Sequence, residues 1–165
     1  VNALIAGDMH MISDVDAKMI KLIERSNGVG INSTKSGRYG GICILKNTAP
    51  GNNADFVKGM QLIQDRERIV RSILKGHGEV GNDHPISTAY GADHCYELPQ
   101  RQFDPDKAKY HLKKSGITSA ELFLAEVATG IGDSCLLMQN NLKKIGFDLK
   151  IKKVPCDGYL VAFCL

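Results

Sequence analysis

The chain has 165 residues and a mass of 18.0 kDa, with 43% hydrophobic, 24% charged and 6% aromatic residues. This composition excludes a disordered, collagenous or coiled-coil protein and predicts one α/β domain with a single core. The net charge of +3 is too small to indicate nucleic-acid binding without a concentrated basic patch, and the lysines at positions 143, 144, 150, 152 and 153 are explained better as solvated surface. No apolar run reaches the roughly 18 residues of a membrane-spanning helix.

The two ends of the chain are unusually apolar. Residues 1–7 open without a polar lead-in or a basic leader, and residues 159–165 are almost wholly apolar. We therefore expect the chain to begin inside a structural element and to end on a packed strand or an adhesive tail.

The five cysteines, at positions 43, 95, 135, 156 and 164, form no CxxC pair and no zinc-finger spacing. A disulfide framework is not expected, although Cys156 and Cys164 could pair. Cys43 and Cys135 lie in apolar segments and are predicted to be small buried hydrophobes.

The first half of the chain predicts a strand, a helix, two further strands and a long helix. The strand covers residues 8–12, and a helix capped by residues 13–16 runs to Arg25, where Ser26, Asn27 and Gly28 end it. Residues 29–34 and 41–45 are predicted to be a hairpin or two neighbouring strands around a turn at 35–38. After the loop at 47–53, residues 54–75 show a helical period with a charged, solvent-facing side.

The second half begins with an irregular stretch over residues 76–103, and loops of that length are usually functional or lie against another surface. Asp104 as N-cap and Pro105 at the first helical position predict a helix to Lys114. Residues 121–127 predict a strand, residues 130–145 a helix, and residues 147–154 a second strand. This order is a βαβ unit, so we expect parallel strands, a right-handed crossover, and an α/β or α+β class with a mixed sheet.

Two motif types could carry chemistry. His84, His94 and Cys95 in the irregular stretch could hold a metal with His77 or Asp93 as a fourth ligand, or could form a thiol site, although their spacing matches no closed zinc site.

Two GxG pairs, 28–30 and 130–132, do not continue into a phosphate-binding fingerprint. The second pair joins a strand end to a helix N-terminus, where free N–H groups and the helix dipole favour an anion such as a carboxylate. A plain glycine-rich turn explains it equally well.

Several blocks together resemble the family 5 extracellular solute-binding proteins, which are receptors of bacterial ABC importers. They are residues 65–70 (DRERIV), 74–78 (LKGHG), 82–86 (NDHPI), 103–109 (FDPDKAK) and 142–147 (LKKIGF). Residues 7–12 resemble the lead into the C-terminal lobe of that family, and the resemblance covers residues 1–159.

The resemblance implies one lobe of a two-lobed periplasmic binding protein of the type II, peptide-binding class: an α/β lobe with a mixed sheet and flanking helices. Such receptors close on a peptide between two lobes and deliver it to a membrane permease. Residues 1–159 would be the C-terminal lobe and residues 160–165 an atypical apolar tail. We therefore expect a truncated, frameshifted or trimmed reading frame that lacks the N-terminal lobe, and a periplasmic or cell-surface location.

The resemblance places Thr129, Gly130 and Ile131 at the ligand cleft, together with Arg38 and Tyr39. It implies no catalysis, no cofactor and no resident metal, and the solute could be a peptide, a sugar, a nickel complex or haem. Two alternatives stay open: a thiol- or metal-dependent hydrolase centred on His84, His94 and Cys95, and a module that self-associates through its former inter-lobe face.

Overall fold

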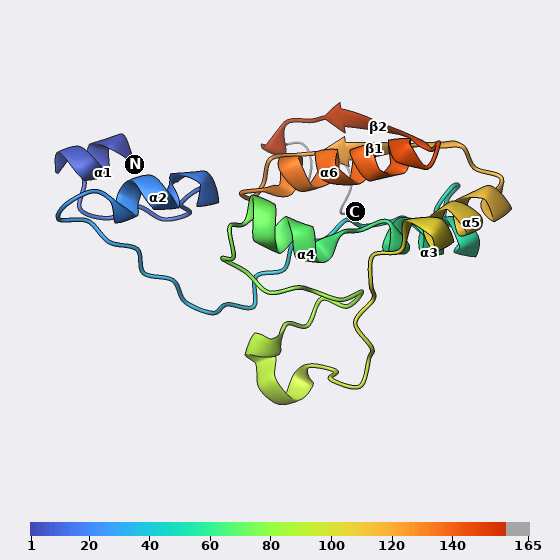
Figure 1. The fold of residues 1–165 in the computed structure, drawn as a ribbon, viewed down its shortest axis with the longest axis horizontal. Helices are drawn as coiled ribbons and strands as arrows, with labels where there is room; N and C mark the ends of the chain where they lie inside the picture. Colours follow the sequence, from blue (N-terminus) through green and yellow to red (C-terminus); the bar gives the residue numbers. More distant parts are fainter. Residues whose placement is uncertain (158–165) are drawn as a thin grey trace.

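The computed structural model describes residues 1–157, which form a small α/β body and an N-terminal helical segment set apart from it (Figure 1). The N-terminal segment holds α1 (Asn2–Ala6), the 3₁₀ turn η1 (Ala17–Met19) and α2 (Ile20–Glu24). The body comprises α3 (Ala54–Leu62), α4 (Arg66–Arg68), the π-helical η2 (Ile69–Ile73), the 3₁₀ segment η3 (Thr88–Asp93), α5 (Pro105–Ser115), β1 (Ser119–Leu124), α6 (Ile131–Lys144) and β2 (Asp148–Lys153). None of the described helices is long and apolar enough to cross a bilayer.

The predicted βαβ unit is confirmed. β1 and β2 pair in parallel, from Ser119 opposite Asp148 to Leu124 opposite Lys153, and α6 connects them. β1 begins and ends two to three residues earlier than the apolar pattern predicts. These two strands are the whole sheet of the described residues, with helices packed beside them, so the predicted α/β class with flanking helices holds. The predicted mixed sheet is not found within residues 1–157, where the one strand pair is parallel.

The core lies where α3, α5, α6 and β2 meet. Its buried members are Phe56, Met60, Leu62, Ile63, Ala108, Leu112, Met138, Leu142, Phe147 and Leu149. Helices α3 and α5 approach closely at Gly59, because a Cβ built there would lie 2.6 Å from Leu112 Cγ and 3.2 Å from the carbonyl oxygen of Ala108. Only a glycine allows this separation of the two helices.

The predicted ends of α5 are confirmed in detail. The Asp104 side chain accepts a hydrogen bond from the Lys107 N–H at 2.9 Å, Pro105 occupies the first helical position, and Gly116 ends the helix at φ 73°. These are the residue types that helix termini require, since each satisfies or removes an unpaired backbone group.

Three predictions for the first half were wrong. Residues 8–12 are not a strand. They follow a helix at residues 2–6, which Gly7 ends at φ 85°, and no described strand pairs with them. Residues 29–34 and 41–45 form no hairpin; Ile42 and Ile44 still pack against the core, but no described segment supplies a hydrogen-bonding partner. The helix predicted over residues 54–75 is broken after Leu62, where Asp65 caps a new turn by accepting from the Arg68 N–H.

The cysteines divide between buried and exposed. Cys135 is buried, as predicted, and burial raises the pKa of its thiol. Cys43 is exposed, which corrects the predicted burial: in an extended segment that alternates sides, it faces away from Ile42 and Ile44. Cys156 is a free, exposed thiol, while Cys164 and the predicted tail at 160–165 lie outside the described residues.

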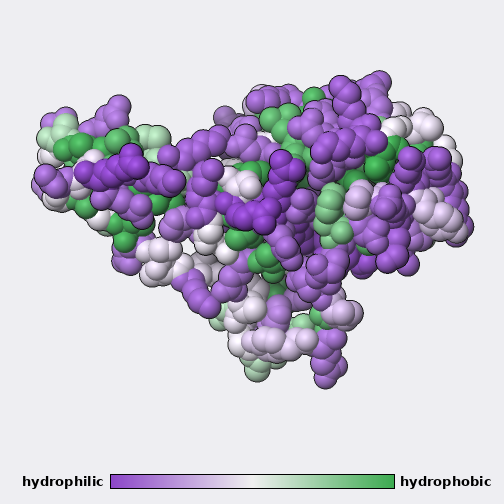
Figure 2. Space-filling model, viewed as in Figure 1, coloured by the Kyte–Doolittle hydropathy of each residue, from purple (hydrophilic) through white to green (hydrophobic). Residues whose placement is uncertain are grey.

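The N-terminal helical segment leaves apolar surface uncovered. Figure 2 shows hydrophobic residues over α1 and α2, and Met11 and Leu22 are 85% and 45% exposed. The helix predicted to Arg25 is confirmed as η1 and α2, with Ile20 and Ile23 buried and Leu22 exposed. Self-association through uncovered apolar surface stays a prediction.

Replacing Gly59 by alanine should destabilise the chain by about 1–3 kcal/mol, because the added methyl group overpacks the contact with Leu112. This outweighs the gain in helix propensity that alanine brings. Urea unfolding of Gly59→Ala should show the loss. Lys58→Ala, at an exposed position of the same helix, is the control and should change stability by less than about 0.5 kcal/mol. Equal stability of the two variants would contradict the close helix approach.

A second prediction concerns the ion pairs between α3 and α5. The Asp55 carboxylate lies 2.7 Å from His111 Nδ1 and 3.1 Å from Lys114 Nζ, and these hydrogen bonds lower its pKa. A lowered folded-state pKa adds stability above the unfolded value of about 4, and that stability is lost as the pH falls through the folded pKa. Asp55→Asn should therefore be less stable than the parent at pH 7, with the gap closing below about pH 4.

Thermal unfolding between pH 2 and pH 7 measures this gap. Asp8→Asn, which removes an exposed carboxylate outside these ion pairs, is the matched control and should follow the parent at every pH. A gap between Asp55→Asn and the parent that persists at pH 2 would contradict the ion-pair origin.

Candidate functional site

The candidate site is a cavity at the carboxyl ends of the two parallel strands, here called the strand-end cavity. Leu124 and Lys153 are the last paired residues of β1 and β2, and the segment after β1 leads directly into the N-terminus of α6. The cavity has a volume of about 370 Å³, and its lining includes Lys18, Glu126, Thr129, Gly130, Asp133 and Lys153. Ligands of open α/β sheets bind at this edge, because loops and helix N-termini converge there.

The charged groups of the strand-end cavity form two pairs. Lys18 Nζ donates to Asp133 Oδ2 at 2.7 Å, and this bond, with the attraction of the carboxylate, raises the pKa of Lys18. Lys153 Nζ lies 3.8 Å from Glu126 Oε1. Lys18 comes from η1, Lys153 from β2, and the two carboxylates flank the start of α6. The cavity thus offers both signs of charge within a small space.

The N-terminus of α6 is partly shielded by the chain itself. Gly130 is the N-cap at φ 82°, and no side chain caps the helix. A Cβ at Gly132 would lie 2.4 Å from Glu126 Oε1, so the Glu126 carboxylate rests against the first turn. An anionic ligand group predicted for this helix end would have to displace or share the place of Glu126.

The five predicted site residues divide between the cavity and other surfaces. Thr129 and Gly130 line the strand-end cavity, and Ile131 begins α6 beside them without lining it. Arg38 lies elsewhere: its Nη1 donates to Asp14 Oδ1 at 2.6 Å, and both side chains are exposed. Tyr39 donates its hydroxyl to the Asn82 carbonyl at 3.2 Å. Arg38 and Tyr39 line no part of the cavity.

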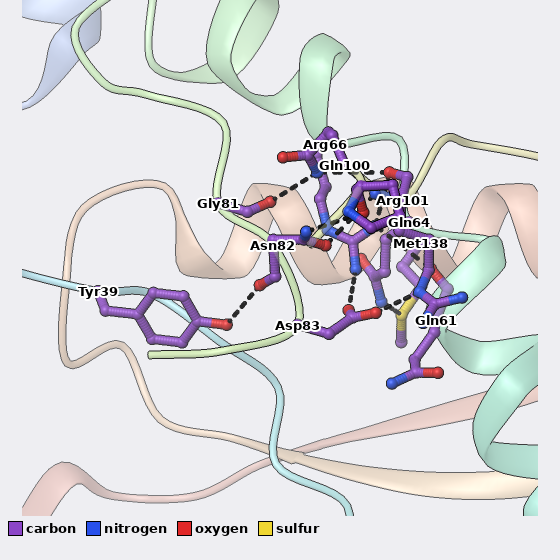
Figure 3. A network of polar contacts seen from close by, with 11 residues as sticks. Tyr39, Gln61, Gln64, Arg66, Gly81, Asn82, Asp83, Gln100, Arg101 and Met138 are labelled. Carbon is purple, nitrogen blue, oxygen red and sulfur yellow. Dashed lines mark hydrogen bonds and ion pairs between the residues drawn. The ribbon is translucent and has the colours of Figure 1, made fainter. Parts of the chain in front are cut away.

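Tyr39 belongs instead to a polar network that anchors the irregular stretch (Figure 3). Asp83 binds the guanidinium groups of both Arg66 and Arg101, and the Asn82 amide donates to the Pro99 carbonyl at 3.1 Å. Partial burial raises the pKa of Tyr39. The network ties residues 81–101 to the start of α4, which accounts for the order of a long segment with little secondary structure.

The alternative centred on His84, His94 and Cys95 lacks a ligand set. The rings of His84 and His94 lie 5.0 Å apart between centroids, and His94 Nδ1 is 2.7 Å from the Ile86 carbonyl oxygen. Throughout residues 1–157, no three His, Cys, Asp or Glu side chains, including His77 and Asp93, are grouped to hold a metal. Cys95 is an exposed free thiol without such a partner set.

Sequence reasoning missed the charged lining of the cavity. Glu126 and Asp133 could have been found, because they flank the predicted strand-to-helix junction and the carboxyl end of a parallel strand is a known ligand edge. Lys153 could have been found in the same way, because it lies at the carboxyl end of the second parallel strand. Lys18 could not be found, because no local pattern predicts that η1, more than 100 residues earlier in the chain, reaches this junction.

Gly130→Ala should destabilise the chain by about 1–2 kcal/mol, because its left-handed conformation disfavours any side chain. The added Cβ would also lie 3.1 Å from Ile73 Cγ2. Gly132→Ala is the control: it meets only the end of the flexible Glu126 side chain, so it should fold with little loss. Urea unfolding of both variants checks the difference, and equal losses would contradict it.

The comparisons with known proteins agree with the sequence resemblance. The family model for bacterial extracellular solute-binding proteins, family 5 Middle, matches residues 1–160. No curated protein matches the chain. Solved structures of other proteins also match this chain.

NikA from Staphylococcus aureus, in complex with Ni(L-His)2, is 19% identical with a TM-score of 0.75, over 96% of this chain and 35% of that chain. The oligopeptide-binding protein AppA from Bacillus subtilis, in complex with a nonapeptide, is 22% identical with a TM-score of 0.74, over 97% and 34%. The periplasmic binding protein DppA from Helicobacter pylori, in complex with the peptide STSA, is 20% identical with a TM-score of 0.78, over 96% and 31%. These likenesses show a shared fold, and the chain spans about a third of each protein.

Proposed function

Because the chain belongs to the family 5 bacterial extracellular solute-binding proteins, we propose that it is a lobe of an ABC-importer receptor that captures a peptide or a related small solute. The observation that carries this proposal is the family match over residues 1–160. At the level of the family the role is binding, without catalysis. The N-terminal lobe of such a receptor and a membrane permease would be the partners, in the periplasm or at the cell surface.

Residues 1–159 would form the C-terminal lobe. Support comes from the length relation, since the chain spans about a third of each of the three similar structures. A single lobe offers a ligand only one wall of the binding cleft. The lone chain should therefore bind its solute weakly, because such receptors gain affinity by burying most of the ligand surface between lobes.

The strand-end cavity is our proposed contact with the solute. Thr129 and Gly130, which line the cavity beside the start of α6, would contact the solute, with Lys18 and Glu126 supplying charges of opposite sign. Ile131 as a ligand contact stays a prediction of the resemblance, because it does not line the cavity. A zwitterionic ligand suits this pairing, because an amine can bind the carboxylates and a carboxylate can bind the lysines. The three similar structures hold peptides or a nickel–histidine complex, all built from amino acids. Arg38 and Tyr39 as ligand contacts stay a prediction of the resemblance.

Nuclear magnetic resonance of the isotopically labelled 165-residue chain tests this proposal. A tetrapeptide at millimolar concentration should shift the amide signals of residues 129–133 and of Lys18, with a Kd of about 1 mM or weaker. Ni(L-His)2 is undesirable in the same experiment because Ni²⁺ broadens signals, so its binding is measured by calorimetry.

Lys18→Gln should reduce the peptide-dependent shifts, because it removes a cation of the cavity. Lys21→Gln removes an exposed charge of the same sign on α2, outside the cavity lining, and should leave the shifts unchanged. Shifts confined to other surfaces would contradict the proposed site. Submicromolar affinity of the lone chain would contradict the two-lobe account.

A further inference from the structure

A second cavity, here called the basic cavity, lies beside the C-terminal half of α6 and has a volume of about 510 Å³. Its lining consists of Arg68, Leu137, Asn140, Asn141, Lys143 and Lys144. Three of these six residues are cationic and none is acidic. The strand-end cavity differs, because each of its lysines faces a carboxylate.

The cations of the basic cavity are not neutralised by the rest of the described chain. Among residues 1–157, the side chains of Arg68, Lys143 and Lys144 have no ion-pair or hydrogen-bond partner. Glu67 precedes Arg68 in the sequence, but no ion pair joins the two side chains and Glu67 does not line the cavity. Asp65 caps α4 by accepting from the Arg68 N–H and does not line the cavity either.

The α6 C-terminus does not account for these lysines either. Lysines near a helix end can bond the last carbonyls. Here backbone groups already do so, because the Ile145 and Phe147 N–H groups donate to the Leu142 carbonyl and the Gly146 N–H donates to the Lys143 carbonyl. The ammonium groups of Lys143 and Lys144 are therefore available to a ligand.

A buried polar group provides an independent indication. Asn141 is 5% exposed, and its Nδ2 is the one buried side-chain nitrogen or oxygen within residues 1–157 that lacks a hydrogen-bond partner. Leaving a buried donor unsatisfied is unfavourable, and folded proteins avoid it unless a ligand, ion or water completes the site. Asn141 is one of the lining residues of the basic cavity, and its Nδ2 is shielded from solvent, so Nδ2 would reach an acceptor in the cavity by a turn of the side-chain amide.

We propose that the basic cavity binds a phosphate group, which accepts a hydrogen bond from Asn141 Nδ2 and is neutralised by Arg68, Lys143 and Lys144. A phosphate carries up to two negative charges and several acceptor oxygens, which matches three unpaired cations and one amide donor. The group could belong to free phosphate or to an anionic lipid headgroup. This proposal is independent of the solute-binding role.

Titration of the 165-residue chain with inorganic phosphate, at constant ionic strength set by sodium chloride, tests the site. Phosphate should move the side-chain amide signal of Asn141 saturably and raise the melting temperature. In parallel, co-sedimentation with phosphatidylglycerol vesicles, against phosphatidylcholine vesicles, tests the lipid source. Saturable binding of phosphate alone identifies free phosphate as the source, and binding of phosphatidylglycerol vesicles alone identifies the headgroup.

Two variants test whether the phosphate group binds at the basic cavity. Replacing Arg68, Lys143 and Lys144 together by glutamine should weaken binding about tenfold or more. A matched triple replacement of the exposed Lys46, Lys109 and Lys113 by glutamine changes the net charge equally and should leave binding unchanged. Asn141→Leu should also weaken binding, and it should raise the melting temperature of the free chain because an unsatisfied buried donor is removed.

Absence of saturable binding in both arms would overturn the proposal. Equal weakening by the matched triple variant would overturn it as well, because binding would then follow net charge alone. The exposed cation variants keep the test decisive even if Asn141→Leu fails to fold.

Discussion

The close approach of α3 and α5 at Gly59 is the constraint on which the body of this chain depends. With no side chain at Gly59, Leu112 and Ala108 of α5 come into contact with the backbone of α3. Phe56, Ile63 and Leu142 of α6 then belong to one continuous buried core. A wider separation would open a cavity in that core, and such cavities are costly because interiors are packed at crystal density.

That core fixes the position of α6, and residues of α6 line both candidate sites. One side of α6 is buried through Cys135, Met138 and Leu142, so its two ends and its outer side remain available to ligands. The N-terminal end meets the carboxyl ends of β1 and β2, where charges of both signs are paired. The outer side near the C-terminal end gathers cations without carboxylates. One helix thus presents two surfaces of different chemistry.

The two surfaces also differ in whether their polar side chains already have partners within the chain. At the strand-end cavity, Lys18 and Lys153 already have carboxylate partners, so a ligand must exchange with existing contacts. At the basic cavity the buried Asn141 donor has no partner among the described residues, so a ligand would complete an interaction instead of replacing one.

The sequence by itself determined the elements whose signals are local. The cap at Asp104, the end of α5 at Gly116 and the parallel unit of β1, α6 and β2 were predicted because capping and periodicity act within a few residues. The two-lobed fold class was implied by the resemblance of the family blocks. Tertiary structure alone decided that residues 41–45 find no partner strand among residues 1–157, that Cys43 faces outward and that Lys18 reaches Asp133. These depend on which distant segments meet, and pairing partners leave no trace in a local pattern.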